Sequence, residues 1–219
     1  MRQKDQELKK LNDLGLEMIA LVRKQVSKVG ESFAKRDISL AEEVIRIEAR
    51  VDALELNIDR VCEEILTLQQ PLASDFRFVL SVLRMNSELE RIGDYAKDIA
   101  EYILKWDEDL NLDLFKALQL PEMFATVDAM IGLIYESLEK EDVNLPRKVF
   151  PMDAVLNGIK NEGPNHIAKA IKNEAISINQ ALNLHTTVRK MERMGDQVKN
   201  IAEELIYYLE AKVVKHRKL

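Results

Sequence analysis

The sequence predicts an all-α protein built as two tandem three-helix bundles, with six long helices that arise from an internal duplication. Three observations support this fold class. The 219 residues are 47% apolar but include only 7 glycines and 5 prolines, which leaves little material for the turns of a β fold. Apolar residues recur at three- and four-residue steps along most of the chain, as on one face of a helix. The two halves of the sequence also align with each other.

Three amphipathic stretches make up the first half. Apolar residues form one helical stripe over residues 14–33. Residues 37–39 supply a break and an N-cap, and a second helix is expected from there to about residue 68. A third helix is expected over about 71–106, with a proline in its first turn.

The second half repeats this pattern after a linker or short helical connection over residues 107–120. Three more helices are expected, over about 121–140, 144–173 and 175–214. Gly163-Pro164 is expected to kink or interrupt the middle one, because proline removes a helix hydrogen bond. We therefore assign the first bundle to residues 1–108 and the second to residues 109–219.

The internal repeat is visible in two segments. A shift of 105 residues matches 11 of the 38 positions from 17 to 54 with identical residues. A shift of 102 aligns ERIGDYAKDIAE at 90–101 with ERMGDQVKNIAE at 192–203, identical at 8 of 12 positions. The change of shift implies a three-residue length difference before the last helix. The second match is too dense to arise from the choice of shift, so a duplicated bundle is expected.

Charge and cysteine content exclude several classes of protein. The formal net charge of -6 argues against nucleic-acid binding, which usually needs a basic face. The single cysteine, Cys62, has no partner for a disulfide or a cysteine-type zinc site, and we expect it to be a small core residue. The start of the chain is too charged for a signal peptide, and no apolar run is long enough to span a membrane, so a cytoplasmic protein is expected.

Acidic residues four apart form stripes on two helices of the first half. Glu90, Asp94, Asp98 and Glu101 fall on one face of the third helix, opposite its apolar stripe, so they are expected to face outward. The second helix carries another such stripe, whose members are Glu48, Asp52, Glu55 and Asp59. Like charges at this spacing repel unless a cation lies between them, and clustered carboxylates suit hard cations.

The duplication retains only part of these stripes. The corresponding residues of the second half are Asp153 and Asn157 on one helix and Glu192, Asp196 and Asn200 on the other. Glu55 and Asp59 become Lys160 and Pro164, so we expect these two acids to be solvated surface. The alternative to cation binding, left open here, is that the acids pair with basic residues on neighbouring faces, namely Arg91, Lys97, Arg193 and Lys199. Gly93 and Gly195 occupy the same repeat position inside helices, which would allow another helix or a ligand to approach closely; simple helix packing is the favoured interpretation.

The two motif copies, the segment LQQPLASDFR at 68–77 and the three-plus-three helix pattern resemble the PhoU family of bacterial phosphate-response regulators. The resemblance covers about residues 11–209. It implies two three-helix bundles with surface metal clusters, commonly of iron, held by acid-x-x-x-Asp motifs on paired helices. Zinc, nickel, manganese, magnesium and calcium are further candidates.

The metal ligands that the resemblance implies differ between the halves. The first set is Glu48, Asp52, Glu90 and Asp94, with Asp98 in reach. The second set is Asp153, Glu192 and Asp196, with Asn157 and Asn200 as departures from the acidic pattern. Over the five matched positions the first set offers five negative charges and the second offers three. We therefore expect the second site to bind metal more weakly, or to hold a smaller cluster.

The resemblance also implies a function and partners. Such a protein acts with the ATPase of a phosphate ABC transporter and with a membrane sensor histidine kinase, and represses phosphate-starvation genes when phosphate is plentiful. It is expected to be a homodimer and to reach the membrane only through its partners. Whether it represses genes or only tunes transport stays open. The chain has no glycine-rich phosphate loop and no supported nucleophile arrangement, which is consistent with a non-catalytic adaptor.

Two other classes of function fit the sequence less well. A ferritin-like di-iron enzyme would need Glu-x-x-His motifs that point into a bundle. None of His166, His185 and His216 has an acid three residues before it, and the acids are expected to face outward. A purely structural coiled-coil oligomer is weakened because the apolar pattern is broken into six helices. A regulator is therefore favoured over both.

Overall fold

The computed structural model describes residues 3–106 and 111–214, and every regular element in that part of the chain is an α-helix. The long helices are α1 (Gln3–Lys35), α2 (Ile38–Leu68), α3 (Ser74–Leu104), α5 (Leu120–Lys140), α7 (Val149–Lys172) and α8 (Ile178–Glu210). The short helices are α4 (Leu112–Ala117) and α6 (Asn144–Arg147). The predicted all-α fold with six long helices is confirmed. The boundary placed between residues 108 and 109 lies outside the described residues.

Local side-chain contacts explain several helix starts. The carboxylate of Asp37 accepts a hydrogen bond from the Leu40 amide at 3.2 Å, so the N-cap predicted within residues 37–39 is confirmed. The hydroxyl of Ser177 caps α8 in the same way, accepting from the Gln180 amide at 3.1 Å. These caps satisfy amide groups that have no partner inside the helix.

Two helix boundaries differ from the prediction. α3 begins at Ser74 instead of residue 71, because Gln70 and Ala73 both have a positive φ of 44°, which a helix cannot contain. The helix expected over 144–173 is divided at Lys148 into α6 and α7.

Pro164, by contrast, does not interrupt α7, which continues through it to Lys172. The residue before it, Gly163, lacks the Cβ atom that would clash with the proline ring. Pro164 also lies on the exposed face of the helix. Of the kink or interruption predicted at this dipeptide, the interruption is therefore wrong, and the kink stays a prediction.

The duplication extends to the turns between helices. The Ser32 hydroxyl donates to the Asp37 carbonyl oxygen at 2.7 Å, and the Ser137 hydroxyl donates to the Asp142 carbonyl oxygen at 2.9 Å. These two contacts are related by the 105-residue shift. We call two residues repeat mates when they are related by this shift in α1 and α2 or by the 102-residue shift in α3.

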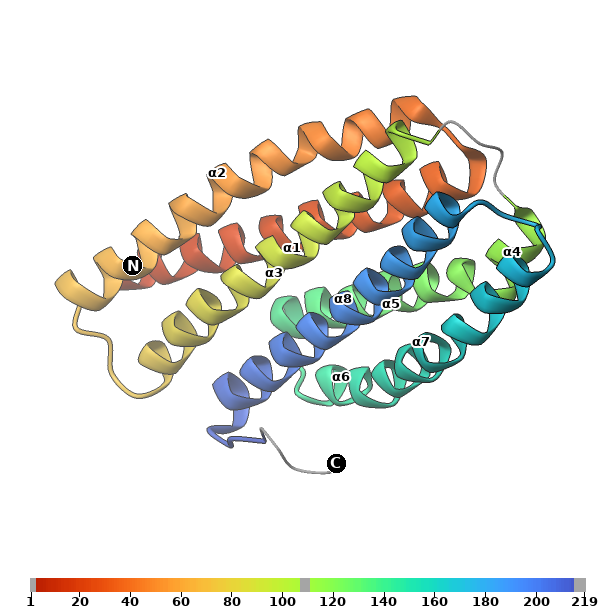
Figure 1. Ribbon diagram of the computed structural model, residues 1–219. Coiled ribbons are helices and arrows are strands. Elements are labelled where there is room, and N and C mark those ends of the chain that lie inside the picture. The colour runs from red at the N-terminus through yellow and green to blue at the C-terminus, as the bar shows by residue number, and fades with distance from the viewer. Residues whose placement is uncertain (1–2, 107–110, 215–219) are drawn as a thin grey trace.

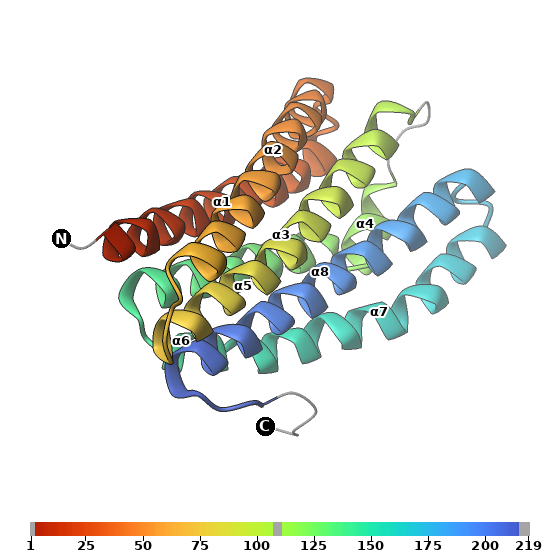
Figure 2. The ribbon, with the colours of Figure 1, turned by 90° about the vertical axis from the view of Figure 1, so that its left-hand side faces the viewer.

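The two halves meet through their first and third long helices. α1 packs against α5 and α3 packs against α8, whereas α2 and α7 lie on the outside (Figures 1 and 2). Among the described residues, α2 contacts only α1 and α3. Its apolar stripe includes Val44, Val51 and Ile58, all buried against these two helices. The helix pairs α2/α3 and α7/α8 are therefore equivalent positions at the two outer sides of the molecule, and the line along which the two helices of a pair meet is called its groove below.

Polar contacts between the halves follow an approximate two-fold relation. The Lys190 ammonium group on α8 pairs with Asp98 on α3, and the Asn200 amide on α8 donates to Glu88 on α3 at 3.4 Å. Glu88 and Lys190 are repeat mates, as are Asp98 and Asn200, so the two contacts exchange under the 102-residue shift. The helices run antiparallel, as Figure 1 shows.

No helix within the described ranges combines the length and the apolar character needed to cross a bilayer.

Candidate metal sites

The first candidate site lies in the groove between α2 and α3. α2 presents Glu48 and Asp52, and α3 presents Glu90 and Asp94, each pair one helical turn apart. Glu48 is only 2% exposed, whereas the Asp94 side chain is 51% exposed. The carboxylates of this site therefore range from fully buried to half exposed.

Glu48 lies directly against the backbone of α3. A Cβ atom on Gly93 would stand 2.8 Å from Glu48 Oε2, so the glycine makes room for this carboxylate. Gln25 on α1 donates its side-chain amide to the same oxygen at 2.6 Å. The other oxygen, Oε1, is buried without a hydrogen-bond partner. Gly93 thus allows close packing of α3 and also makes room for the carboxylate of a candidate ligand.

Within the part of the chain that the structure describes, the acids of the first site have little compensating positive charge. Burial raises the pKa of Glu48 to about 7; the Gln25 amide opposes this shift, while the neighbouring carboxylates of Asp94 and Asp52 add to it. Burial likewise raises the pKa of Glu90 to about 7, and Asp94 and Glu55 add to the shift. The one ion pair recorded for Asp94 is with Lys97, at 3.9 Å. These carboxylates therefore repel one another unless they are protonated or bind a cation.

Glu55 and Asp59 are not simply solvated surface, as the sequence had led us to expect. Both are only partly exposed. Burial raises the pKa of Glu55, with Asp59, Asp52 and Asp94 adding to the shift. Asp59 accepts a hydrogen bond from the Asn86 amide at 2.8 Å. Glu55 therefore extends the acidic groove, and Asp59 has a structural partner.

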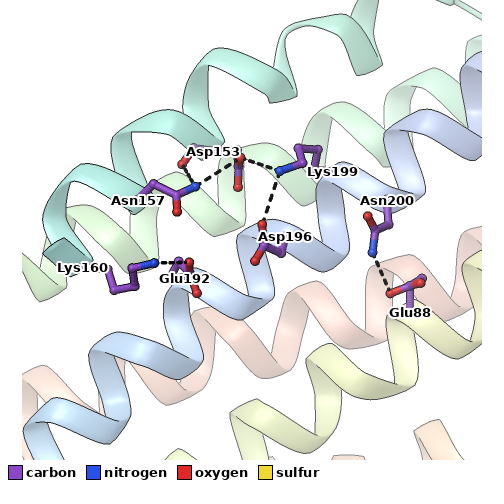
Figure 3. Close-up of polar contacts among 8 residues, drawn as sticks. All are labelled: Glu88, Asp153, Asn157, Lys160, Glu192, Asp196, Lys199 and Asn200. Carbon is purple, nitrogen blue, oxygen red and sulfur yellow. Dashed lines mark hydrogen bonds and ion pairs between the residues drawn. The ribbon is translucent and has the colours of Figure 1, made fainter. Parts of the chain in front are cut away.

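The second candidate site lies in the equivalent groove between α7 and α8, and there each acid has a lysine partner (Figure 3). The Lys199 ammonium group lies 2.9 Å from Asp153 and 3.3 Å from Asp196. Lys160 lies 2.8 Å from Glu192. Burial alone would lower the pKa of Lys199, but its contacts with Asp153 and Asp196 raise it overall. In this half, therefore, basic residues do pair with the acids. Lys199 was among the expected partners, and Lys160 was not.

Asn157 and Asn200 have different positions in the second half. The Asn157 side-chain amide donates to the carbonyl oxygen of Asp153 at 3.1 Å and to its carboxylate at 3.3 Å. Asn157 is thus part of the groove. Asn200 instead contacts Glu88 across the interface between the halves (Figure 3).

Asp98 occupies the corresponding interface position in the first half, paired with Lys190. Lys190 also lies 5.4 Å from the ring centre of Tyr95 and 5.9 Å from that of Tyr102. The sequence had placed Asp98 in reach of the acidic cluster. The structure gives it and its mate Asn200 contacts in the α3/α8 interface.

The expectation that the acids face outward is only partly correct. Asp94 and Asp196 have half-exposed side chains, but Glu48, Asp153 and Glu192 are buried, at 2%, 6% and 9% exposure. A helical wheel gives the direction of one helix's own core. It does not show that a second helix packs alongside and covers part of the polar face.

Lys160 and Lys190 were not recognised as partners from the sequence. The signal was present in the repeat, since Lys160 is the mate of Glu55 and Lys190 is the mate of Glu88. A change from acid to base at a repeat position next to retained acids indicates an internal counter-charge.

The donor chemistry of the two grooves differs in its fit to a metal. Among the described residues, no three potential ligand side chains converge closely enough to hold an ion as they stand. In the first groove, however, Asp94 adds to the raised pKa of both Glu48 and Glu90, and Glu48 Oε1 has no hydrogen-bond partner. Its all-oxygen donor set suits a hard cation. In the second groove the same positions are occupied by ion pairs.

Comparison with known proteins gives a consistent assignment over both halves. The model of the PhoU domain family matches residues 16–103 and 120–205. A PhoU homolog of Aquifex aeolicus, described as a phosphate-specific transport system accessory protein, is 29% identical over 96% of this chain and 95% of its own length.

Two solved structures share the fold. The crystal structure of PhoU from Pseudomonas aeruginosa is 27% identical and has a TM-score of 0.87 over 96% of this chain and 100% of that chain. The structure of a phosphate transport system regulatory protein PhoU from Streptococcus pneumoniae is 25% identical, with a TM-score of 0.87 over 97% of this chain and 100% of that chain.

Proposed function

Because this chain belongs to the PhoU domain family, we propose that it is an accessory protein of a phosphate-specific transport system, which restrains phosphate uptake and the phosphate-starvation response. The observation that carries the proposal is the family match in both halves together with the common fold over the full length of solved PhoU structures. The relatives are described as accessory and regulatory proteins of phosphate transport.

In this proposal the protein is a non-catalytic adaptor between the ATPase of the transporter and a membrane sensor histidine kinase. An adaptor needs exposed surface that can be buried against a partner. The connection between α2 and α3 provides such surface. Leu68 and Leu72 are 74% and 77% exposed there, and Phe76 in the first turns of α3 is 45% exposed. This support is independent of the grooves.

The proposal assigns a metal to the groove between α2 and α3. Glu48, Asp52, Glu90 and Asp94 would hold it, and iron is the expected metal. A bound cation would supply the positive charge that these carboxylates lack and would join α2 to α3. The unpartnered oxygen of Glu48 and the raised pKa values of Glu48 and Glu90 support this assignment.

A genetic experiment tests the regulatory role. In the source organism, deletion of the gene is expected to switch on a phosphate-starvation reporter even in high phosphate, and the wild-type gene is expected to restore repression. The proposed role in gene control is wrong if the deletion strain still represses the reporter. Uptake of radioactive phosphate in the same strains then separates a repressor from a protein that only tunes transport.

A binding experiment tests the adaptor role. The purified full-length protein is expected to retain the transporter ATPase and the kinase of the same organism on an affinity column, with retention that differs between high and low phosphate. The Leu72→Glu variant, which places a charge on the exposed surface between α2 and α3, is expected to retain these partners less well. Failure to retain either partner under both conditions contradicts the adaptor role and leaves the fold assignment intact.

A further inference from the structure

We infer that Lys160 and Lys199 take the place of a metal in the α7/α8 groove, so that this duplicated chain has a metal site in its first half only. The part that concerns the first half rests on the proposed function. The part that concerns the second half stands on the contacts of that groove alone.

The first argument is the complete pairing of the second groove. Its three acids share two ammonium groups, Lys199 with Asp153 and Asp196 and Lys160 with Glu192, all within 3.3 Å. The Asp153 and Glu192 side chains are only 8% and 12% exposed, so these two carboxylates are shielded from water, while their lysine partners are about one third exposed. A cation that bound here would have to displace both lysines first.

The second argument is the difference at repeat mates. Lys160 corresponds to Glu55, so a negative group of the first groove is replaced by a positive one in the second. Gln25, which donates to Glu48, corresponds to Met130, which is fully buried and has no N–H or O–H donor. Lys199 supplies the missing donor to the Glu48 mate, Asp153.

The third argument is the space beside the glycine of α8. A Cβ atom on Gly93 would meet the Glu48 carboxylate first, whereas on Gly195 it would meet Leu156 Cδ1, at 2.4 Å. Hydrocarbon therefore fills the place that a ligand oxygen holds in the first groove. Asp153 Oδ1, like Glu48 Oε1, is buried without a hydrogen-bond partner, but the other oxygen of Asp153 is bound to the positive Lys199 ammonium group, whereas that of Glu48 is bound to the neutral Gln25 amide.

Charge counting points the same way. In the second groove three carboxylates and two ammonium groups leave one net negative charge. The first groove has Glu48, Asp52, Glu55, Glu90 and Asp94, with Lys97 at 3.9 Å as the recorded counter-ion. The first groove therefore keeps the larger excess of negative charge with which to repay dehydration of a metal ion.

The test uses the full chain with the first groove disabled by Glu90→Gln and Asp94→Asn. The metal-free protein is incubated with Mn²⁺, Zn²⁺ or anaerobic Fe²⁺, desalted, and analysed for bound metal by mass spectrometry. We expect no more metal than in a chelated control. In the same background, Lys160→Gln and Lys199→Gln together should create measurable metal binding. Its dissociation constant should be at least about tenfold lower than that of the same variant with both lysines intact.

The outcomes separate the two proposals. The inference is overturned if the first-groove variant with intact lysines still retains metal, or if removing the lysines leaves its affinity unchanged. Lys160→Gln alone serves as a second variant if the double change prevents folding, which circular dichroism reports. If wild-type protein retains no metal while the lysine variants gain it, the metal assignment of the first half fails and the inference about the second half stands.

Discussion

Lys160 Nζ lies 2.8 Å from Glu192 Oε1, and the repeat mate of this lysine in the first half is an acid, Glu55. In the first half, Glu55 repels the Glu90 carboxylate, the mate of Glu192, and adds to the raised pKa of Glu90. The two halves of the duplicated scaffold therefore differ in the charge balance of their acidic grooves. The second half carries its own cations, and the first half is left with unbalanced negative charge.

The lysines at matched positions of the two grooves should differ in their contribution to stability. In the metal-free protein, Lys199→Met is expected to lower the free energy of unfolding by about 2–4 kcal/mol, because it leaves the buried Asp153 carboxylate without a cation. Its mate, Lys97→Met, should cost less than about 0.5 kcal/mol, because Asp94 is half exposed and 3.9 Å away. Urea unfolding in the presence of a chelator measures both, and equal losses would contradict the different roles.

The two helix glycines should respond differently to alanine. Gly195→Ala is expected to destabilise the protein by about 1–3 kcal/mol, since its Cβ would overlap the fully buried Leu156. Gly93→Ala should displace the Glu48 carboxylate and reduce metal retention.

Gly158→Ala is the matched control for these two substitutions. Nothing lies within 4 Å of its added Cβ, so this change in the exposed face of α7 should stabilise by about 0.5–1 kcal/mol. Thermal unfolding and metal analysis of the three variants give the comparison. A Gly93→Ala variant with full metal content would contradict the placement of Glu48 in the site.

Cys62 should be chemically inert in the folded protein. Burial raises the pKa of its thiol to about 12 from an ordinary 9.0, so at pH 9 the thiolate fraction is about 500-fold below that of a half-ionised unfolded chain. Alkylation by iodoacetamide should be correspondingly slow in buffer and fast in urea. Since the folded pKa is the higher one, this group's contribution to stability is lost as the pH rises from about 9 through 12. Rapid alkylation in buffer would show that the thiol is accessible.

Lys190 should stabilise the interface between the halves. It is 14% exposed, pairs with Asp98 and lies beside the rings of Tyr95 and Tyr102. Lys190→Met is therefore expected to lower the free energy of unfolding by about 1–3 kcal/mol. Asn200→Ala, at the related contact, should cost about 0.5 kcal/mol, because its bond to Glu88 is long, at 3.4 Å. Chemical denaturation of both variants tests this order, and the reverse order would refute it.

Leu72 should act in partner binding and not in folding. Leu72→Glu is expected to leave the unfolding temperature unchanged, because the side chain is 77% exposed, and to weaken retention of the transporter ATPase by at least about tenfold. Leu182→Glu, on the exposed face of α8 at 59% exposure, is the control. Equal retention of the two variants would place the partner surface elsewhere.

Helix content and the acid-x-x-x-acid spacing were predictable from sequence because each is local, and the duplication was predictable because the two halves retain identical residues. Apolar periodicity identifies a helix within a few turns, and the Asp37 cap contacts an amide three residues away. The burial of Cys62 also followed from its position near the apolar stripe of α2 and is confirmed. Proline at 164 misled the prediction, because its effect on α7 depends on the glycine before it.

The sequence by itself therefore determined that two three-helix units exist and that each carries acids on a pair of helices. Only the tertiary structure decided which acids are buried, which are paired with lysines, and which lie between the halves. Asp98 and Lys190 are 92 residues apart, and Lys160 and Glu192 are 32 apart on different helices. Such contacts depend on how helices pack side by side, which sets the distance between charges and their access to water, and the periodicity of a single helix does not contain this information.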